Sequence, residues 1–143
     1  MAEEEDKYEF TYQELDERGQ PHGNLKVSET GAAYKYDENA NKIPLTCFAF
    51  VRFTNKDSYE GFYKDAKKCG KGVYRYFKDG DKYEGTWKDD RKHGLGKMEY
   101  RGKGREGEYH GYWEHDKRHG EGVFAYKNGD VYSGWWKYGH KTG

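Results

Sequence analysis

Residues 83–96 read YEGTWKDDRKHGLG, and residues 109–122 read YHGYWEHDKRHGEG. The two stretches carry Tyr, Gly, Trp, His, Gly and Gly at the same six offsets. This agreement has two explanations: the His belongs to a functional site, or it is one position of a structural repeat. Self-similarity at a regular spacing indicates a repeat architecture. The rest of the chain decides between the two explanations.

The pattern recurs along most of the chain. Aligned on its first residue, it begins at Tyr59, Tyr83, Tyr109 and Tyr132, with spacings of 24, 26 and 23 residues. We interpret residues 59–143 as three clear repeats followed by a C-terminal half repeat.

The same frame extends more faintly towards the N-terminus. Tyr12 and Tyr36 continue the spacing, but the Gly and Trp of the first strand are missing there. We interpret residues 12–58 as two degenerate hairpin repeats, which brings the array to about five and a half units. Residues 1–11 form an acidic N-terminal segment outside this frame that need not be ordered.

Each repeat is predicted to be a β-hairpin. Tyr83, Gly85 and Trp87 alternate with other residues, and residues 96–100 alternate in the same way. This period of two is typical of strands, and Asp-Gly and Asn-Gly pairs between units favour tight turns. A strand Gly leaves a bare patch of backbone on which a ring from a neighbouring strand can lie. The glycines expected to receive Tyr or Trp rings are Gly61, Gly85, Gly111 and Gly134.

The fold class predicted from these features is all-β: an elongated, single, twisted antiparallel sheet of consecutive β-hairpins. A thin core agrees with 33% apolar residues, 18% aromatic residues and 20 Gly. The formal net charge is zero, with 7 Lys and Arg against 12 Asp and Glu in residues 1–58 and 19 against 14 in residues 59–143. This mild asymmetry permits contact with an acidic surface, but it is far from the basic excess of nucleic-acid-binding proteins.

We expect a cytoplasmic protein without a transmembrane segment. The opening residues MAEEEDKYEF are acidic where a secretory signal is basic and then apolar. No run reaches the ~18 apolar residues of a membrane span. Cys47 and Cys69 are expected to be reduced thiols and not a disulfide.

The repeat resembles the MORN repeat (membrane occupation and recognition nexus), with the pattern Y-x-G-x-W-x-x-x-x-x-H-G-x-G. Residues 83–96 and 109–122 match it position by position. Residues 59–72 depart from it twice, with Tyr63 in place of Trp and Cys69 in place of His. The clear match covers residues 59–143 and is weak before them.

The periodicity assigns the His to the repeat. His22, His93 and His119 share one offset beside a Gly, where an imidazole can pack on an aromatic ring or bond to backbone. His115 and His119 are four residues apart, a spacing that suits a metal on a helix but not in a turn. No G-x-S-x-G motif or activated cysteine is present. We therefore predict no catalytic site, no bound metal and no cofactor.

Aromatic side chains are the predicted partner-binding residues, because Tyr and Trp dominate many protein interfaces. Candidates on the core side, some of which must also pack the sheet, are Tyr63, Trp87, Trp113 and Trp136. Rings that alternate away from the core stripe have no packing duty within it and are the stronger candidates. They are Phe62, Tyr112 and Trp135.

A second candidate surface is cationic. Lys and Arg recur in the turn after each first strand, and stacked hairpins place these turns along one edge about 10 Å apart. Such a row can contact anionic lipid head groups or acidic protein tails. Interleaved acidic residues favour the alternative that these charges keep the edge soluble. The row comprises Lys67, Lys68, Arg91, Lys92, Lys117 and Arg118.

We predict a non-enzymatic scaffold that binds other proteins of a large assembly, with self-association through the sheet ends as one mode. Short MORN arrays are often cytoskeletal, and residues 118–136 (RHGEGVFAYKNGDVYSGWW) are similar to radial-spoke head proteins. The resemblance thus implies the axoneme of a cilium or flagellum. One alternative is a module that binds phosphoinositides or anionic membranes. Another is the regulatory N-terminal part of an enzyme whose catalytic domain lies outside this chain, since LDERGQPHGN at 15–24 resembles the start of some SET-domain methyltransferases.

Overall fold

A computed structural model describes residues 10–15, 21–28, 34–36, 38–39, 41–53 and 55–143. The regular structure of these residues is entirely β-sheet. In chain order the strands are β1 (Phe10–Leu15), β2 (Pro21–Ser28), β3 (Tyr34–Tyr36), β4 (Lys42–Pro44), β5 (Cys47–Arg52), β6 (Ser58–Lys64), β7 (Lys67–Arg75), β8 (Lys82–Lys88), β9 (Arg91–Tyr100), β10 (Gly107–Glu114), β11 (Lys117–Tyr126), β12 (Val131–Lys137) and β13 (His140–Lys141).

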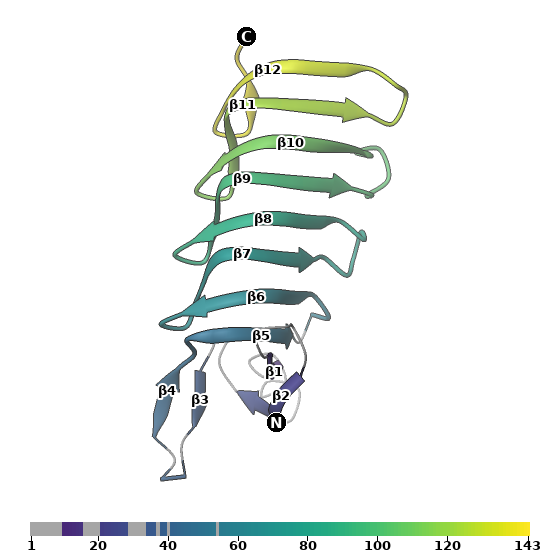
Figure 1. Ribbon diagram of the computed structural model, residues 1–143. Coiled ribbons are helices and arrows are strands. Elements are labelled where there is room, and N and C mark those ends of the chain that lie inside the picture. The colour runs from purple at the N-terminus through teal and green to yellow at the C-terminus, as the bar shows by residue number, and fades with distance from the viewer. Residues whose placement is uncertain (1–9, 16–20, 29–33, 37, 40, 54) are drawn as a thin grey trace.

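Eleven strands form one antiparallel sheet (Figure 1). From β5 to β13, successive strands of the chain pair with one another, so the sheet grows as a ladder of hairpins. This arrangement confirms the predicted fold class, an elongated antiparallel sheet of consecutive β-hairpins.

The N-terminal end of the sheet departs from chain order. There β1 pairs with both β5 and β2, while β3 and β4 form a separate hairpin that projects from the sheet (Figure 1). The division of residues 12–58 into two degenerate repeats stays a prediction, because part of this segment lies outside the described residues. Residues 1–9 lie outside them as well.

Two-residue turns join the strands of each repeat. Asp89 and Asp90 have φ angles of 48° and 73°, and His115 and Asp116 have 48° and 69°. Two successive positive φ angles are the mark of a type I′ turn, whose twist matches that of the flanking strands. Asp and His adopt this region more readily than most residues other than Gly. The next strand therefore starts earlier than expected: residues 91–92, assigned to a turn from the sequence, open β9.

A β-bulge lies beyond each turn. In the β8–β9 pair Gly85 lies opposite Gly96, but Trp87 lies opposite Lys92, so three residues of β9 face one residue of β8. Gly94 is in this bulge and has a φ of 84°, a conformation that Gly adopts without the steric cost of a Cβ. Register shifts recur at the same place in the β6–β7 and β10–β11 pairs. The Gly of the His93-Gly94 and His119-Gly120 pairs, with φ angles of 84° and 76°, thus has a backbone role.

Tyrosine rings lying on glycine backbone form the centre of the core. Gly85 pairs with Gly72 on one side and Gly96 on the other. A Cβ on Gly85 would lie 2.5 Å from the Gly96 Cα and 2.7 Å from the Tyr83 hydroxyl oxygen. The ring over Gly85 therefore comes from its own strand, and not from the strand beside it as expected. The fully buried Tyr83 also donates a 2.9 Å hydrogen bond to the Thr86 carbonyl.

Tryptophans join these tyrosines into a continuous series of rings, termed here the aromatic ladder. Trp87 packs edge-on against Tyr83 and Tyr59, with ring centroids 5.2 and 5.5 Å apart. Trp113 makes the same contacts with Tyr109 and Tyr83, each at 5.3 Å. Such pairs contribute about 0.5–1.5 kcal/mol each beyond burial. Because each Trp touches a ring of its own repeat and one of the preceding repeat, the ladder links successive hairpins.

Replacing Gly85 by Ala is expected to lower the free energy of unfolding by about 1–3 kcal/mol, because the added methyl group overlaps the Gly96 backbone and the Tyr83 ring. Chemical denaturation followed by Trp fluorescence measures this loss. Ser133→Ala, at an exposed position of β12, is the control and should change the stability by less than about 0.5 kcal/mol. Equal stability of the two variants would contradict the packing role of the glycine.

Stability is also expected to fall as the pH rises above about 10. Burial raises the pKa of Tyr109 to about 12 and also raises the pKa of Tyr59 and Tyr83. In the unfolded chain these groups ionise near a pKa of about 10. Their contribution is therefore complete below that pH and is lost as the pH rises towards the folded-state values. Urea unfolding at about pH 9 and about pH 11 tests the sign, and greater stability at the higher pH would refute it.

Candidate functional site

The predicted row of cations divides into two sets, because successive side chains of a strand point to opposite faces. At the start of β9, Arg91 faces solvent, whereas Lys92 turns onto the aromatic ladder and is only 8% exposed. The exposed set is Lys67, Arg91 and Lys117. The inward set, which is buried or half-buried, is Lys68, Lys92 and Arg118.

Lys92 occupies a cage of four rings. Its Nζ lies 5.5–5.9 Å from the ring centroids of Tyr76, Tyr83, Trp87 and Trp113, and it donates a 3.0 Å hydrogen bond to the Tyr76 hydroxyl. Burial lowers the pKa of Lys92. The attraction between the ammonium group and the ring faces, about 0.5–2 kcal/mol in such sites, offsets part of the desolvation. This amine is therefore a component of the core.

An aspartate from the next repeat holds each inward lysine. The Lys92 backbone N–H donates to Asp116 Oδ1 at 2.8 Å, and the Lys92 Nζ lies 3.7 Å from the same oxygen. Lys68 makes the corresponding contacts with Asp90 at 3.0 and 2.9 Å. Each aspartate is the second residue of its turn, and its N–H donates back to the lysine carbonyl. These contacts tie one hairpin to the next.

A sequence signal distinguishes the inward cation from its exposed neighbour. The position is Lys or Arg in all four units, at residues 68, 92, 118 and 141, whereas the position before it is His140 in the last unit. A position that is cationic in every repeat indicates a structural requirement for the charge. The prediction from repeat spacing grouped the inward cation with the exposed residue before it, because both lie in the same cationic segment.

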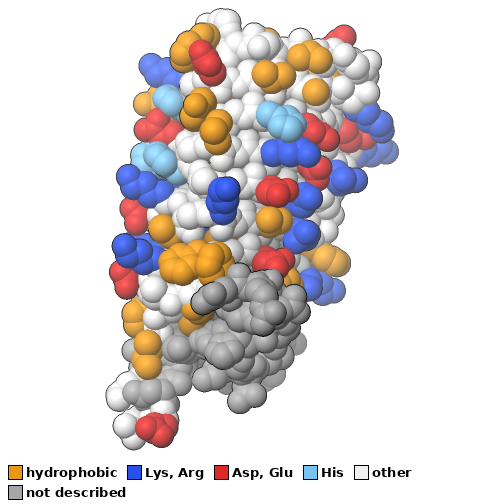
Figure 2. All heavy atoms as spheres, viewed as in Figure 1, with side chains coloured by type: hydrophobic (Ala, Val, Ile, Leu, Met, Phe, Trp, Pro, Cys, Tyr) orange, Lys and Arg blue, Asp and Glu red, His pale blue; other side chains and the backbone are white. Residues whose placement is uncertain are grey.

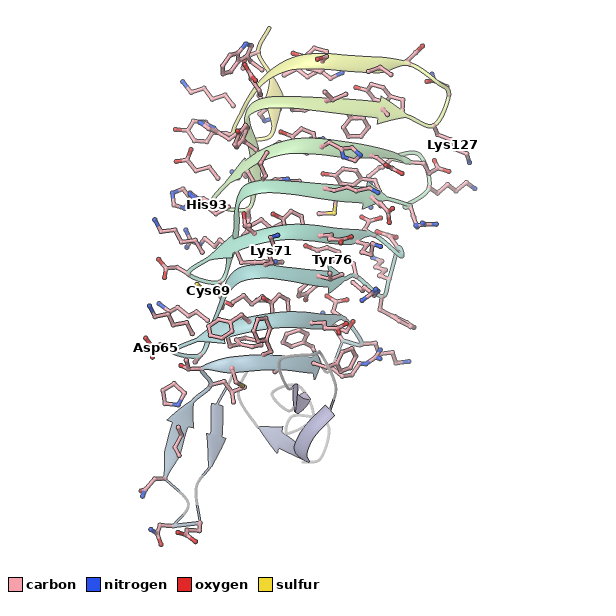
Figure 3. All side chains as sticks on the ribbon, in the orientation of Figure 1. Asp65, Cys69, Lys71, Tyr76, His93 and Lys127 are labelled. Atoms are coloured by element: carbon pink, nitrogen blue, oxygen red, sulfur yellow. The ribbon has the colours of Figure 1, made fainter. Side chains whose placement is uncertain are left out.

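The exposed cations lie at the margin of the sheet that carries the two-residue turns. Figure 3 shows Asp65, Cys69 and His93 along this margin and Lys127 at the opposite one. Basic, acidic and His side chains alternate there in Figure 2. Because Asp65 and Asp89 are exposed beside the cations, the margin is mixed in sign.

The predicted aromatic candidates separate by face. The core-side set is almost fully buried in the aromatic ladder, with exposed fractions between 2% and 5%: Tyr63, Trp87, Trp113 and Trp136. On the opposite face, Tyr112 and Trp135 are 48% and 55% exposed, and Phe62 is half-buried. Among these candidates, the exposed rings are therefore found on the face that has no part in the ladder.

Further apolar residues, absent from the sequence-based candidates, lie on this opposite face. Leu95 is 58% exposed and lies opposite Tyr112 across the β9–β10 pair. Phe48 lies opposite Phe62, and their rings make an edge-on contact at 5.0 Å. Successive residues of a strand face opposite sides, and Gly96 lies on the aromatic face. The sequence alone could therefore have placed Leu95 on the opposite face. The set Phe48, Phe62, Leu95, Tyr112 and Trp135 is termed the apolar stripe, and Figure 2 shows hydrophobic side chains gathered on this face.

The repeated histidines contact neighbouring turns. The ring centroid of His93 lies 6.3 Å from that of His115, and the ring of His119 lies 5.7 Å from that of Tyr138. In each case the partner is the first turn residue of the next hairpin. His119 Nε2 also lies 3.2 Å from a Glu114 carboxylate oxygen. The side chain of His22 lies outside the described residues.

Chemistry-bearing residues are dispersed over the described part of the chain. No group of three or more His, Cys, Asp or Glu is arranged there to hold a metal ion. Cys47 and Cys69, on β5 and β7, are half-buried and are not joined by a disulfide. Among the same residues, no helix has the length and hydropathy that a membrane crossing requires.

A groove of about 590 Å³ opens on the aromatic side of the sheet towards the C-terminal end. Aromatic rings and cationic side chains line it together. The ring-bearing part of the lining consists of Tyr100, Phe124, Tyr126 and Trp136. The polar part consists of Arg105, Glu106, Arg118, His140 and Lys141.

Three segments of the chain match the family model of the MORN repeat: residues 59–81, 83–105 and 109–131. No curated protein shows significant similarity to the chain. The matched segments correspond to the hairpins β6–β7, β8–β9 and β10–β11 with the loops that follow them. Modules of this kind generally serve protein or membrane interaction.

Two adjacent tryptophans give a matched test of the two faces. Trp136→Ala removes a ring that is 4% exposed and is expected to lower the free energy of unfolding by about 3–5 kcal/mol. Trp135→Ala removes a ring that is 55% exposed and should cost less than about 1 kcal/mol. Urea denaturation followed by circular dichroism compares the variants. Similar losses at both positions would contradict the assignment of the two faces.

Proposed function

We propose that this array of MORN repeats is a non-enzymatic scaffold that binds other proteins through its apolar stripe. The supporting observation is the exposure of Leu95, Tyr112 and Trp135 on the face that takes no part in the aromatic ladder. Large apolar side chains that are exposed to solvent on one face of a protein indicate an interaction site. Tyr and Trp are also enriched among the residues that carry most of the binding energy at interfaces.

The geometry of the stripe suits an elongated partner segment. Its members project from β5, β6, β9, β10 and β12, so along the long axis of the sheet they form the pair Phe48 and Phe62, the pair Leu95 and Tyr112, and the single ring of Trp135. Polar residues separate these groups, with Thr86 on β8 and Glu121 opposite Trp135 on β11. An amphipathic helix or an extended peptide presents apolar side chains along one line and can match such a surface. The hydrogen-bonded sheet holds the stripe in place before binding, which reduces the entropy lost on association.

The assembly that we propose is cytoskeletal, in the axoneme of a cilium or flagellum and similar in kind to the radial-spoke head. The support for this setting is the resemblance of residues 118–136 to radial-spoke head proteins. The protein would then be a cytoplasmic component that contributes a rigid surface to a larger complex.

Binding to an anionic membrane is a second candidate function. Its support is the pairing of exposed cations at the turn margin, where Lys64 lies opposite Lys67 and Lys88 lies opposite Arg91. The inward cations take no part, because their charged groups lie among the rings. A lipid surface attracts each exposed cation by about 1 kcal/mol, and the neighbouring aspartates reduce that attraction.

The two functions separate on matched variants of the full chain. The double variant Tyr112→Ala/Trp135→Ala should lose capture of axonemal proteins from a ciliated-cell extract, because each large anchor contributes about 2 kcal/mol or more. The triple variant Lys67→Ala/Arg91→Ala/Lys117→Ala should retain it. Quantitative mass spectrometry of the captured proteins gives the comparison, and circular dichroism confirms the fold of each variant.

The reverse pattern would refute the scaffold proposal. It would consist of capture that persists in the double variant, together with salt-sensitive sedimentation on phosphoinositide vesicles that the triple variant loses. Screening by salt weakens contacts between exposed charges, so a salt series on the vesicles distinguishes this mode from apolar binding.

A further inference from the structure

The inward cation of the last full repeat has no aspartate. In the preceding repeats the second turn residue, Asp90 or Asp116, supplies a carboxylate to the inward lysine. The corresponding residue opposite Arg118 is Gly139. Its N–H donates to the Arg118 carbonyl at 3.0 Å, as the turn residues of the other repeats do. The backbone of the repeat is thus preserved, and the carboxylate alone is missing.

The guanidinium of Arg118 is nevertheless held in position. Its Cζ lies 4.4 Å from the ring centroid of Trp136 and 5.6–5.8 Å from three further rings. Its Nη2 donates a 3.1 Å hydrogen bond to the Gly139 carbonyl. Within the described residues no carboxylate lies at ion-pair distance from this group. A fixed planar guanidinium matches the two oxygens of a carboxylate.

Arg118 lines the groove of about 590 Å³ described above, and the charge of that groove is positive. Lys141 lies beside it, with Nζ 4.9 and 4.8 Å from the rings of Tyr126 and Tyr132. Glu106 is the acidic residue of the described lining, and it is already paired with Lys127 at 3.0 Å. Arg105 of the lining is paired as well, with Asp79 at 3.0 Å and Asp81 at 3.1 Å. The two cations Arg118 and Lys141 are therefore the charges left for a ligand.

We propose that this groove binds an acidic segment of a partner protein. An Asp or Glu of that segment pairs with Arg118 and supplies the carboxylate that Gly139 lacks. An apolar side chain next to the acid packs on Tyr126 and Trp136. This site lies on the face opposite the apolar stripe, so it is a second binding surface. Its test is independent of the test of the stripe.

The lining favours a peptide over a phosphate group. A lipid head group or free phosphate would use only the cations, whereas the groove is also lined by four aromatic rings: Tyr100, Phe124, Tyr126 and Trp136. Arg118 also lies among these rings and not on the exposed margin with Lys67, Arg91 and Lys117. A peptide supplies both a carboxylate and an apolar side chain to such a surface.

The substitution Gly139→Asp tests the proposal, because it restores the internal carboxylate. Gly139 has a φ of 87°, close to the 73° and 69° of Asp90 and Asp116, so the turn accepts an aspartate. The variant should unfold at a temperature no lower than that of the wild type and should lose acidic ligands. Gly129→Asp is the matched control, since Gly129 has a φ of 99°, has open space around it and lies outside the groove lining.

The probe is a phage-displayed library of random peptides selected on the full chain. Enriched peptides should share an Asp or Glu beside an aromatic or aliphatic residue, and replacing that acid by its amide should weaken binding about tenfold or more. The Gly139→Asp variant should show the same loss, while Gly129→Asp and the apolar-stripe variant Tyr112→Ala/Trp135→Ala should bind as the wild type does.

Three results would overturn the proposal. The first is enrichment of peptides without an acidic residue. The second is equal binding of acidic peptides to Gly139→Asp and wild type, or their loss in the stripe variant, which would place them elsewhere. The third is Arg118-dependent binding of phosphoinositide vesicles or inorganic phosphate with no acidic peptide enriched, which would assign the groove to a phosphate ligand.

Discussion

The packing of one tyrosine ring on a pair of facing glycines is the constraint on which the other features depend. The Tyr83 ring occupies the space that Cβ atoms on Gly85 and Gly96 would fill. A slip of one residue between strands would put a side chain under the ring and turn the ring to the other face. Register is therefore set once in every repeat, at positions close together in the chain. Because of this, the sheet can extend by adding hairpins, and each new Trp joins the existing rings.

A single sheet has no second layer to cover its aromatic face, and the inward cations meet part of that need. The charged groups of Lys68, Lys92 and Arg118 lie over ring faces, where the attraction between a cation and an aromatic ring stabilises them. The aspartates of the following turns then neutralise the lysines. This use of charge explains how a chain with 36% charged residues and 33% apolar residues forms a core. It also means that half of the predicted basic row belongs to the fold and not to the surface.

The structural features that could be predicted from the sequence are those that follow from the alternation of residues along a strand. The alternation of Tyr83, Gly85 and Trp87 was sufficient to predict the hairpins, the aromatic face and the exposed side of Tyr112. The cations were harder to place, because the two-residue turn and the bulge at Gly94 determine which of Arg91 and Lys92 turns inward. The pairing of β1 with β5 is a contact between distant segments, and the missing Gly and Trp leave no periodic signal for it there.

The position between the strand Gly and the following aromatic residue shows which side chains the fold leaves unconstrained. It is occupied by Phe62, Thr86, Tyr112 and Trp135. At Thr86 the hydroxyl satisfies itself on nearby backbone carbonyls, and the hairpin is the same as its neighbours. Because the repeat forms without a ring at this position, ring packing in the core does not explain Tyr112 or Trp135. The same logic applies to Gly139, where the turn keeps its backbone although the aspartate is absent. At these positions the residue differs between repeats because the tyrosine–glycine packing does not constrain the side chain there. One repeat can therefore acquire a binding property at such a position that its neighbours lack.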